Sequence, residues 1–335
     1  MKKIGFLYGI EQTFSRSVIE SINNLNIKGV SAELMKVGAT KTEDIFKYKV
    51  ILDRASHEVP FYRSVLKLAF LRGVKIVNNP FLSFADDNFF HASLAENINI
   101  NVPKSVILPS KEHPPGTNSE TMRNMVFPID WDAVFEHVGF PAYIKPNLLS
   151  PFHDSYKVYN PSEFFSAYDL TGNRPMLLQE SIEYDTYYKC FVIGKKHVRV
   201  MTYNPIKPHQ QRYISLEWGI DEETRRRLSE FSIKICETFG FDFNAIEFAV
   251  KDNVPYAVEF MNPAATAELS ILHEKNFNWI VENTASFLIE KALERKKTPS
   301  ALNWNELLLD AKAETGKVAK KRKSIRKKRS KILYK

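Results

Sequence analysis

Two glutamates in apolar, strand-like runs are the first candidates for chemistry. Glu247 lies in NAIEFAV and Glu259 in YAVEFMNP, with a short turn at 251–253 between the two runs. A hairpin there would pair the runs and bring the two carboxylates alongside each other, in surroundings where an unpaired carboxylate is costly. Together with Asn262, they predict hard oxygen ligands suited to Mg²⁺. The alternative is that each acid lies on a solvent-facing strand surface.

A lysine and a strand end predict contacts with a nucleotide. Lys145 ends the run AYIKP, and a lysine on a rigid strand can hold phosphate as a point charge. The run 176–182 ends in Gln179, Glu180, Ser181 and Ile182, where extended backbone can read an adenine edge. An acid that follows this strand can accept hydrogen bonds from ribose hydroxyls. The alternatives are a surface lysine and an ordinary strand end that carries acids.

The elements that must position these residues change in type along the chain. Strand-like and helix-like runs alternate over the first 100 residues, which predicts an α/β domain with a parallel, Rossmann-like sheet. From residue 140 the runs read as antiparallel hairpins with helices near 161–169, 222–239 and 276–295, which is an α+β pattern. We therefore expect an α/β domain at 1–100, an α+β region with antiparallel sheets at 101–295, and a linker and tail at 296–335.

The charge of the chain is concentrated in its C-terminal tail. Of the 47 Lys and Arg residues, 11 lie in 317–335, a segment without an acid, and the remaining 36 face 39 acids. Such a block repels itself, so we expect a disordered basic tail. It predicts weak contact with polyanions such as nucleic acid, ribosomes or an anionic membrane surface. The alternative is a solvated tail that aids solubility.

Several function classes lack their sequence signals here. With only 12 glycines, the chain has no GxGxxG and no GxxxxGK[ST], and it has no HExxH or GxSxG. No apolar run approaches the length of about 20 residues that a membrane span needs. The basic and then apolar N-terminus predicts a first strand rather than a signal peptide. Cys190 and Cys236 have no metal-binding spacing and favour a reducing, cytoplasmic compartment.

The order of these features resembles the ATP-grasp superfamily. A strand lysine, a loop, the strand end "QESI", a hairpin and an acidic strand pair ending "EFMNP" follow one another over about residues 80–290. The closer likeness is to D-alanine–D-alanine ligase, glutathione synthetase and the ribosomal-protein glutamate ligases. The preceding α/β domain suits the first domain of that superfamily.

The resemblance implies a site for ATP and Mg²⁺. The residues that it assigns to ATP are Lys145 for the α- and β-phosphates, Gln179, Glu180 and Ile182 for adenine, and Glu183 or Asp185 for ribose. The metal ligands would be Glu247, Glu259 and Asn262. The loop 147–156 would be a mobile flap that uses Ser150, His153 and Ser155 in place of glycine backbone. His153 would donate to the γ-phosphate, and the alternative is an exposed loop histidine without a role in binding.

The chain departs from the superfamily pattern at three places. The flap has no glycine, so backbone N–H groups approach phosphate less freely. Where the superfamily often has a second ATP lysine, the stretch reads Asp86-Asp87-Asn88. Glu259 and Asn262 are three residues apart instead of two, and positions i and i+3 of a regular strand face opposite sides. We therefore expect a bulge or turn at 260–262 that re-aims Asn262.

The implied activity is that of an ATP-dependent ligase. ATP would phosphorylate a substrate carboxylate, and an amine, or as the less favoured alternative a thiol, would attack the acylphosphate. Arg212 and Lys207 are the candidates for the basic groups near the γ-phosphate, with a surface loop as the alternative. Arg54, Ser56 and His57 end a strand of the first domain, where open α/β sheets bind ligands, and they are the candidates for the carboxylate substrate.

Two hypotheses from different classes follow from the sequence. In the first, the partners are small-molecule or peptide carboxylates and amines, and an oligomer is compatible with everything above. In the second, the chain is a non-catalytic nucleotide or nucleic-acid binding protein, with the basic tail as its active part. Turnover of Mg·ATP with an acid and an amine separates the two.

Overall fold

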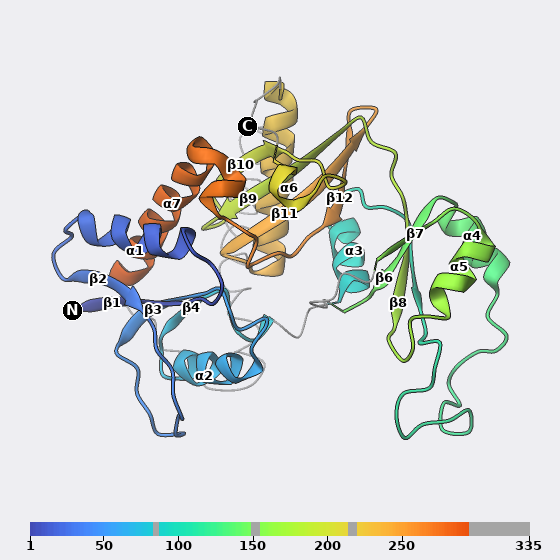
Figure 1. Ribbon diagram of the computed structural model, residues 1–335, viewed down its shortest axis with the longest axis horizontal. Helices are drawn as coiled ribbons and strands as arrows, with labels where there is room; N and C mark the ends of the chain where they lie inside the picture. Colours follow the sequence, from blue (N-terminus) through green and yellow to red (C-terminus); the bar gives the residue numbers. More distant parts are fainter. Residues whose placement is uncertain (83–86, 149–154, 214–219, 295–335) are drawn as a thin grey trace, which may run out of the picture.

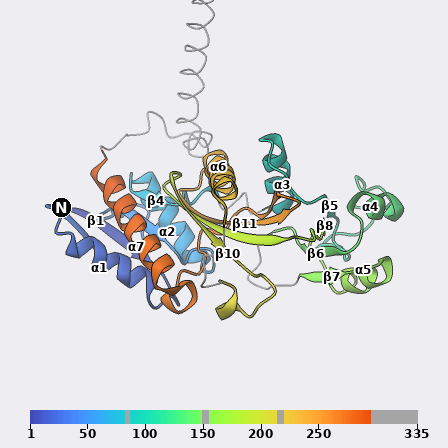
Figure 2. The ribbon, with the colours of Figure 1, turned by 90° about the horizontal axis from the view of Figure 1, so that it is seen from above.

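The computed structural model describes residues 1–82, 87–148, 155–213 and 220–294. These residues contain three four-stranded sheets and the helices that pack against them. The first sheet has the strand order β2-β1-β3-β4, the second β5-β8-β6-β7 and the third β10-β9-β11-β12. Figures 1 and 2 show the third sheet lying between the other two. The predicted basic tail lies outside the described residues.

The first sheet is entirely parallel, as the alternation of strands and helices predicts. Its strands are β1 (Lys2–Leu7), β2 (Val30–Leu34), β3 (Tyr48–Asp53) and β4 (Lys75–Val77). On one face lie α1 (Phe14–Asn24) and the C-terminal helix α7 (Leu269–Leu293), which run side by side in Figure 1. On the other face lies α2 (Pro60–Leu71). The parallel sheet is confirmed, and the Rossmann-like description stays a prediction.

The second sheet is antiparallel and carries the predicted phosphate lysine. Its strands are β5 (Ser105–Leu108), β6 (Ala142–Pro146), β7 (Tyr156–Val158) and β8 (Met176–Glu180). One face packs against α4 (Trp131–Val138) and α5 (Pro161–Tyr168) through a core rich in aromatic rings. The hairpin of β6 and β7 is the one that the sequence around Lys145 predicts. Its tip at 149–154 lies outside the described residues.

The third sheet is also antiparallel and is covered on both faces. Its strands are β9 (Thr186–Ile193), β10 (His197–Thr202), β11 (Phe243–Lys251) and β12 (Val254–Glu259). One face packs against α6 (Glu222–Phe239) and α3 (Asn88–Asn97). The other face shares a core with α7, α1 and the first sheet, so the first domain and the third sheet form one continuous packed body. The two predicted hairpins, β9–β10 and β11–β12, are both confirmed.

Local sequence explains where the helices begin and end. The helices α3, α4, α5 and α6 each begin after a residue whose side chain accepts a hydrogen bond from a backbone N–H of the first turn. These residues are Asp87, Asp130, Asn160 and Asp221, respectively. α6 ends at Gly240 in the left-handed conformation, with φ of 83°. α7 begins earlier than the expected residue 276, because a first turn at 269 joins the main helix across His273, whose φ is 57°.

Candidate nucleotide and metal site

The two predicted metal ligands face each other across the β11–β12 ladder. Glu247 is the direct partner of Glu259, whereas the next pair is Phe248 with Ala257, so Val258 is an extra residue in β12. Without this bulge, Glu247 would pair with Val258 and the two carboxylates would lie on opposite faces of the sheet. The bulge therefore places both carboxylates on one face. Glu247 is buried and Glu259 is half-buried.

A lysine and a tyrosine of β9 hold Glu247. The Lys189 ammonium lies 2.8 Å from Oε1 of Glu247, and the Tyr187 hydroxyl donates to Oε2 at 2.8 Å. Burial by itself lowers the pKa of Lys189, but Glu247 and nearby tyrosines outweigh it, and the pKa of Lys189 is raised overall. Burial, followed by the negative charge of Glu247, raises the pKa of Tyr187 well above its usual value. Both groups therefore keep their protons at neutral pH.

Lys145 reaches the same place from the second sheet. Burial lowers the pKa of this lysine, and the charges of Glu259 and Glu247 oppose that effect. Lys145 therefore lies within electrostatic reach of both carboxylates, although about a hundred residues separate it from them in the sequence. Two lysines and two glutamates from two sheets thus form a group whose formal charges balance, which we call the charge cluster (Lys145, Lys189, Glu247 and Glu259).

The segment that carries Asn262 leaves the β12 ladder and is held by a buried amide. β12 ends at Glu259, and Nδ2 of Asn244 donates to the carbonyl oxygen of Phe260 at 2.7 Å. Oδ1 of the same Asn244 accepts from the backbone N–H of Asn262 at 2.8 Å. Asn244 is fully buried. The chain is irregular at the expected residues 260–262, but the bulge itself lies two residues earlier, at Val258.

The predicted adenine segment ends β8 and is partly engaged in backbone pairing. Gln179 is buried, and its side chain donates to the Ser105 hydroxyl at 3.1 Å. The backbone N–H of Glu180 donates to Lys104, and Ile182 packs at the edge of the core that α7 shares with the third sheet. The segment is thus extended and fixed at its start.

The two predicted ribose acids are both exposed and differ in their contacts. Among the described residues, Glu183 has no hydrogen-bond or ion-pair partner. Asp185 accepts from the backbone N–H of Asp252 at 2.8 Å, so it also holds the turn between β11 and β12. Glu183 is therefore the acid of the two whose carboxylate is available to a ligand.

Asn88 stands where the resemblance places a second ATP lysine. Its side chain donates to the carbonyl oxygen of Pro146 at 3.2 Å. Its backbone N–H donates to the carbonyl oxygen of Asn147 at 2.9 Å. Asn88 therefore fixes the backbone directly after Lys145 instead of adding a charge. Of the predicted flap residues, Ser155 is exposed, and Ser150 and His153 lie outside the described residues.

Arg212 connects to the charge cluster through a tyrosine. Its Nη1 donates to the Tyr203 hydroxyl at 3.3 Å, and the Tyr203 ring centroid lies 4.9 Å from the Lys189 nitrogen. Its Nε donates to the carbonyl oxygen of Lys207 at 3.0 Å, and the Lys207 side chain is exposed. Arg212 follows the short 3₁₀ helix η2 (His209–Gln211), and the next six residues, 214–219, lie outside the described residues.

The three first-domain candidates for substrate binding differ in exposure. Arg54 is 4% exposed and bonds to Glu11 and to two backbone carbonyls. Ser56 is buried and donates to Asp53. His57 is exposed, with Nε2 3.6 Å from a carboxylate oxygen of Glu58. His57 is therefore the most accessible of the three to a ligand.

Sequence reasoning missed Lys189, Tyr187 and Asn244. Each is a polar residue inside an apolar strand, which is the signal that identified Glu247, and it was available for these residues too. Lys189 and Tyr187 lie 58 and 60 residues from Glu247 in the sequence, so their contacts with it could not be predicted without the strand order.

The residues present fit a magnesium ion that also binds substrate oxygens. No group of three or more His, Cys, Asp or Glu in the described ranges is arranged to hold a metal by itself. Each Glu247 oxygen accepts one hydrogen bond and keeps a further lone pair. Mg²⁺ commonly takes one or two carboxylates and completes its shell with waters and phosphates. The facing pair Glu247 and Glu259 supplies that number.

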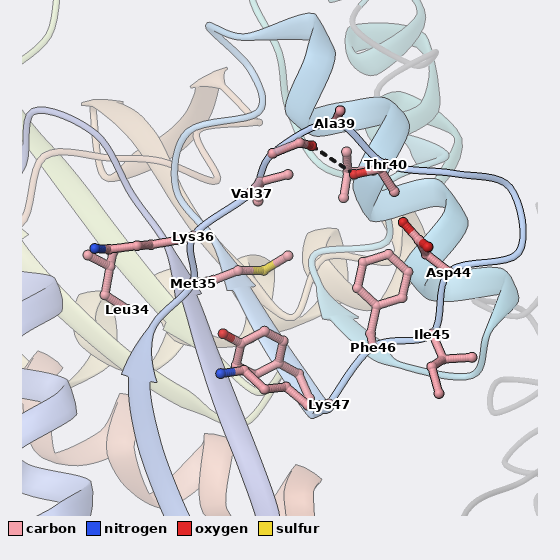
Figure 3. A pocket seen from close by; sticks show the side chains of 13 residues that line it. Leu34, Met35, Lys36, Val37, Ala39, Thr40, Asp44, Ile45, Phe46 and Lys47 are labelled. Atoms are coloured by element: carbon pink, nitrogen blue, oxygen red, sulfur yellow. Dashed lines mark hydrogen bonds between the residues drawn. The ribbon is translucent and has the colours of Figure 1, made fainter.

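A separate cavity of about 400 Å³ lies in the first domain (Figure 3). It is lined by the segments 34–40 and 44–48, on either side of the crossing between β2 and β3, and by Val65 of α2. None of the predicted site residues lines it.

Comparison with solved structures identifies the fold. D-alanine–D-alanine ligase from Bacillus anthracis, complexed with ATP, is 16% identical with a TM-score of 0.57, over 88% of this chain and 97% of that one. A RimK domain ATP-grasp protein from Sphaerobacter thermophilus is 16% identical with a TM-score of 0.60, over 85% and 98%. The ATP-grasp ligase PsnB, complexed with a minimal precursor, is 12% identical with a TM-score of 0.58, over 87% and 99%.

These likenesses extend over nearly the whole length of each solved chain, and they show that this chain has the ATP-grasp fold. No family model matches the chain, and no curated protein matches its sequence. In the parts that the structure describes, no helix is long and apolar enough to cross a membrane.

Proposed function

We propose that the protein is an ATP- and Mg²⁺-dependent ligase that joins a carboxylate to an amine through an acylphosphate. A thiol in place of the amine is the less favoured alternative. The observation that carries the proposal is the charge cluster: Lys145 of one antiparallel sheet and the facing pair Glu247 and Glu259 of another converge within an ATP-grasp fold. A phosphate-binding cation beside two hard oxygen ligands is the arrangement that a metal–nucleotide complex requires.

The nucleotide would lie between the second and third sheets. Lys145 would hold the α- and β-phosphates, while the backbone at 179–182 would read the adenine and Glu183 or Asp185 would hold the ribose. Ser155 and His153 would close over the phosphates from the flap. Glu247, Glu259 and Asn262 would hold Mg²⁺, which when bound neutralises the charge on the transferred phosphoryl group.

The reaction would proceed in two balanced steps. First, a carboxylate oxygen of the substrate attacks the γ-phosphorus, the bond to the β-phosphate oxygen breaks, and ADP leaves. Second, the amine nitrogen attacks the acyl carbon, inorganic phosphate leaves, and the nitrogen loses a proton. In such transfers the protein mainly positions the groups and stabilises charge.

Basic groups beside the transferred phosphoryl group would come from the 203–213 segment. Arg212 touches Tyr203, whose ring lies against Lys189, so its guanidinium is held near the charge cluster. Lys207, exposed and bonded to Arg212 through its carbonyl, would reach in from the same loop. The first-domain segment with Ser56 and His57 would face the acid substrate.

We further propose a cytoplasmic location and small-molecule or peptide substrates. Both cysteines, Cys190 and Cys236, are buried and free, which suits a reducing compartment. The basic tail, on which the non-catalytic alternative depends, lies outside the described residues, and no structural observation favours that alternative. Weak polyanion contact through the tail stays a prediction, as does the oligomeric state.

A screen for phosphate release tests the proposal. The protein is incubated with Mg·ATP and with pairs of an acid and an amine drawn from amino acids and small peptides. Release that requires both partners, and that Glu259→Gln lowers by orders of magnitude, is expected. A protein that binds ATP but releases no phosphate with any pair, while the tail binds polyanions tightly, would support the non-catalytic alternative.

A further inference from the structure

The loop at 262–268, which we call the metal-side loop, is fixed to the first domain by one buried arginine. We infer that Arg54 is a positioning residue for the metal site, and that it acts by holding this loop rather than by touching the substrate. The inference rests on the proposed function, because it concerns the loop that begins at the predicted ligand Asn262.

Arg54 uses its donors within the protein. Its Nη1 donates to the carbonyl oxygen of Pro263 at 3.1 Å, and its Nη2 donates to that of Ala265 at 2.7 Å. Its Nε donates to Oε1 of Glu11 at 2.9 Å, and Nη2 contacts the same oxygen. The planar fork of an arginine suits such a set of simultaneous bonds. A substrate carboxylate could contact this guanidinium only after some of these bonds break.

The surroundings of Arg54 make its position rigid. Its side chain is fully buried, with the guanidinium carbon 5.1 Å from the ring centroid of Phe14 and 5.2 Å from that of Phe243. Phe14 begins α1 of the first domain, and Phe243 begins β11 of the third sheet. The arginine therefore lies where the first domain packs against the third sheet, in contact with both.

The far end of the metal-side loop is fixed to the first domain through Glu268. Glu268 accepts from the backbone N–H groups of Gln12 and Thr13, both at 3.0 Å, and from the Thr13 hydroxyl at 2.7 Å. That hydroxyl in turn accepts from the N–H of Leu269 at 3.0 Å. The first domain thus donates to the loop through Arg54 near its start and through residues 12–13 at its end.

The position of Asn262 follows from these contacts. The third sheet holds the backbone of Asn262 at two points, because Asn244 accepts from its N–H and the N–H of Ala245 donates to its carbonyl oxygen at 3.1 Å. Arg54 fixes the next residue, Pro263, from the first domain. If Arg54 is removed, the loop loses two of its attachments after Asn262, and the Asn262 amide is held less firmly relative to Glu259. Partners that orient metal ligands in this way typically contribute about 10- to 100-fold to metal affinity.

The test measures metal binding without requiring a known substrate. Mn²⁺ replaces Mg²⁺ as a paramagnetic probe, and its dissociation constant is measured by electron paramagnetic resonance in the presence of a non-hydrolysable ATP analogue. Arg54→Gln removes the ion-pair partner of the half-buried Glu11 and can unfold the chain. The main variant is therefore the double change Arg54→Met with Glu11→Leu, which removes both charges together. Glu268→Gln tests the other end of the loop.

The matched control is Lys75→Gln. Lys75 also joins the first domain to the C-terminal part, through the carbonyl oxygen of Lys291 at 3.0 Å and the carboxylate of Glu294, but it does so away from the metal-side loop. We expect Mn²⁺ affinity to fall by about 10-fold or more in the double variant, to fall less in Glu268→Gln, and to stay unchanged in Lys75→Gln.

Two results would overturn the inference, and they are distinguishable. If the unaltered protein binds Mn²⁺ with the analogue and the folded double variant binds it equally well, Arg54 has only a structural role. If the unaltered protein binds no Mn²⁺ with the analogue, the proposed function fails and the inference fails with it.

Discussion

At the scale of single residues, the site depends on a balance of charge. Lys189 and Glu247 are buried and Lys145 and Glu259 are half-buried, so each charge depends on its partners in the charge cluster. In the proposed complex, Mg²⁺ and the ATP phosphates would add charges of both signs to this group. Removing one member leaves its partner uncompensated, so each substitution should change ligand binding more than an exposed charge would.

Changing Lys145 to Met should weaken binding of Mg·ATP. Losing a charge-assisted hydrogen bond costs about 1.5–3 kcal/mol, or roughly 10- to 150-fold in the dissociation constant. Isothermal titration calorimetry with a non-hydrolysable analogue measures it. The control is Lys111→Met, which removes a lysine of the same domain that pairs with Asp169 at the surface. Equal affinity in the Lys145 variant and the parent would remove Lys145 from the nucleotide site.

The same lysine predicts a pH dependence of nucleotide binding. Burial lowers the pKa of Lys145 below its usual value of 10.5, so the unliganded protein loses this proton at a lower pH than an exposed lysine would. Nucleotide affinity should be constant below that pKa and should fall as pH rises through it. Titrations that run from neutral pH up to 10.5, the usual pKa of a lysine, measure the fall.

The arginine variant of Lys145 is the control for this pH dependence, because arginine keeps its charge throughout the range. Lys145→Arg should show no such fall in affinity over the same range of pH. A fall of the same size in both proteins would assign the titration to another group.

Residue types could be predicted better than residue partners. Glu247, Glu259 and Lys145 stand out because each is a charge inside or at the end of an apolar strand, and the structure does bring them together. Arg54 donates hydrogen bonds to Glu11 and to the carbonyl oxygens of residues 263 and 265. These bonds could not be predicted, because the partners lie 43 to 211 residues away in the sequence. From the sequence alone, a polar side chain at the end of a strand is a candidate for ligand binding, because its long-range contacts within the protein are not known.

At the scale of elements, a bulge and a buried amide shape the proposed metal site. The extra residue Val258 places Glu259 on the face of Glu247, and Asn244 then receives the chain as it leaves the ladder. Both features are local departures from a regular hairpin. The sequence predicts the hairpin from its turn and its apolar runs, but strand periodicity alone does not say which residue is the extra one.

Changing Asn244 to Ala should destabilise the protein and weaken metal binding together. The substitution leaves the carbonyl oxygen of Phe260 and the N–H of Asn262 without their partner, and each such loss in a buried place costs about 1–3 kcal/mol. Urea unfolding measures the free energy, and the Mn²⁺ titration measures the site.

The control for Asn244 is Asn283→Ala, which removes an amide whose bond to Trp279 lies within α7. This change should cost less than Asn244→Ala and should leave Mn²⁺ affinity unaltered. Equal losses of stability in the two variants would mean that Asn244 has no special role in holding the loop.

At the scale of the whole molecule, three sheets are needed to assemble one site. The second sheet supplies Lys145, the third supplies the carboxylates, and the first domain holds the metal-side loop. The order of strands and helices was sufficient to predict one parallel sheet and several antiparallel pairings. The close packing of α7 against the first domain was not predictable, because a helix that follows the last hairpin in sequence can pack on any exposed apolar face.

Removing the basic tail should weaken binding to polyanions without lowering catalytic turnover. Truncation after about residue 312 removes a segment in which 11 of the 47 basic residues are concentrated. Turnover with a small substrate should be unchanged, whereas salt-sensitive binding to a polyanion should weaken, because each lost phosphate contact removes a counterion-release contribution. Fluorescence anisotropy with a labelled oligonucleotide at two salt concentrations measures the second effect. A truncated protein without turnover would give the tail a role in the site.

If the protein activates a carboxylate with ATP, as proposed, hydroxylamine will trap the activated acid. The protein is incubated with Mg·ATP, a panel of carboxylic acids and hydroxylamine, which converts an acylphosphate to a hydroxamate that is measured as its coloured iron complex. We predict that at least one acid gives hydroxamate together with equal amounts of ADP, and that Lys145→Met and Glu259→Gln abolish both products. If ATP is cleaved without hydroxamate for every acid, or if the two variants form hydroxamate as fast as the parent, the acylphosphate account of this site is wrong.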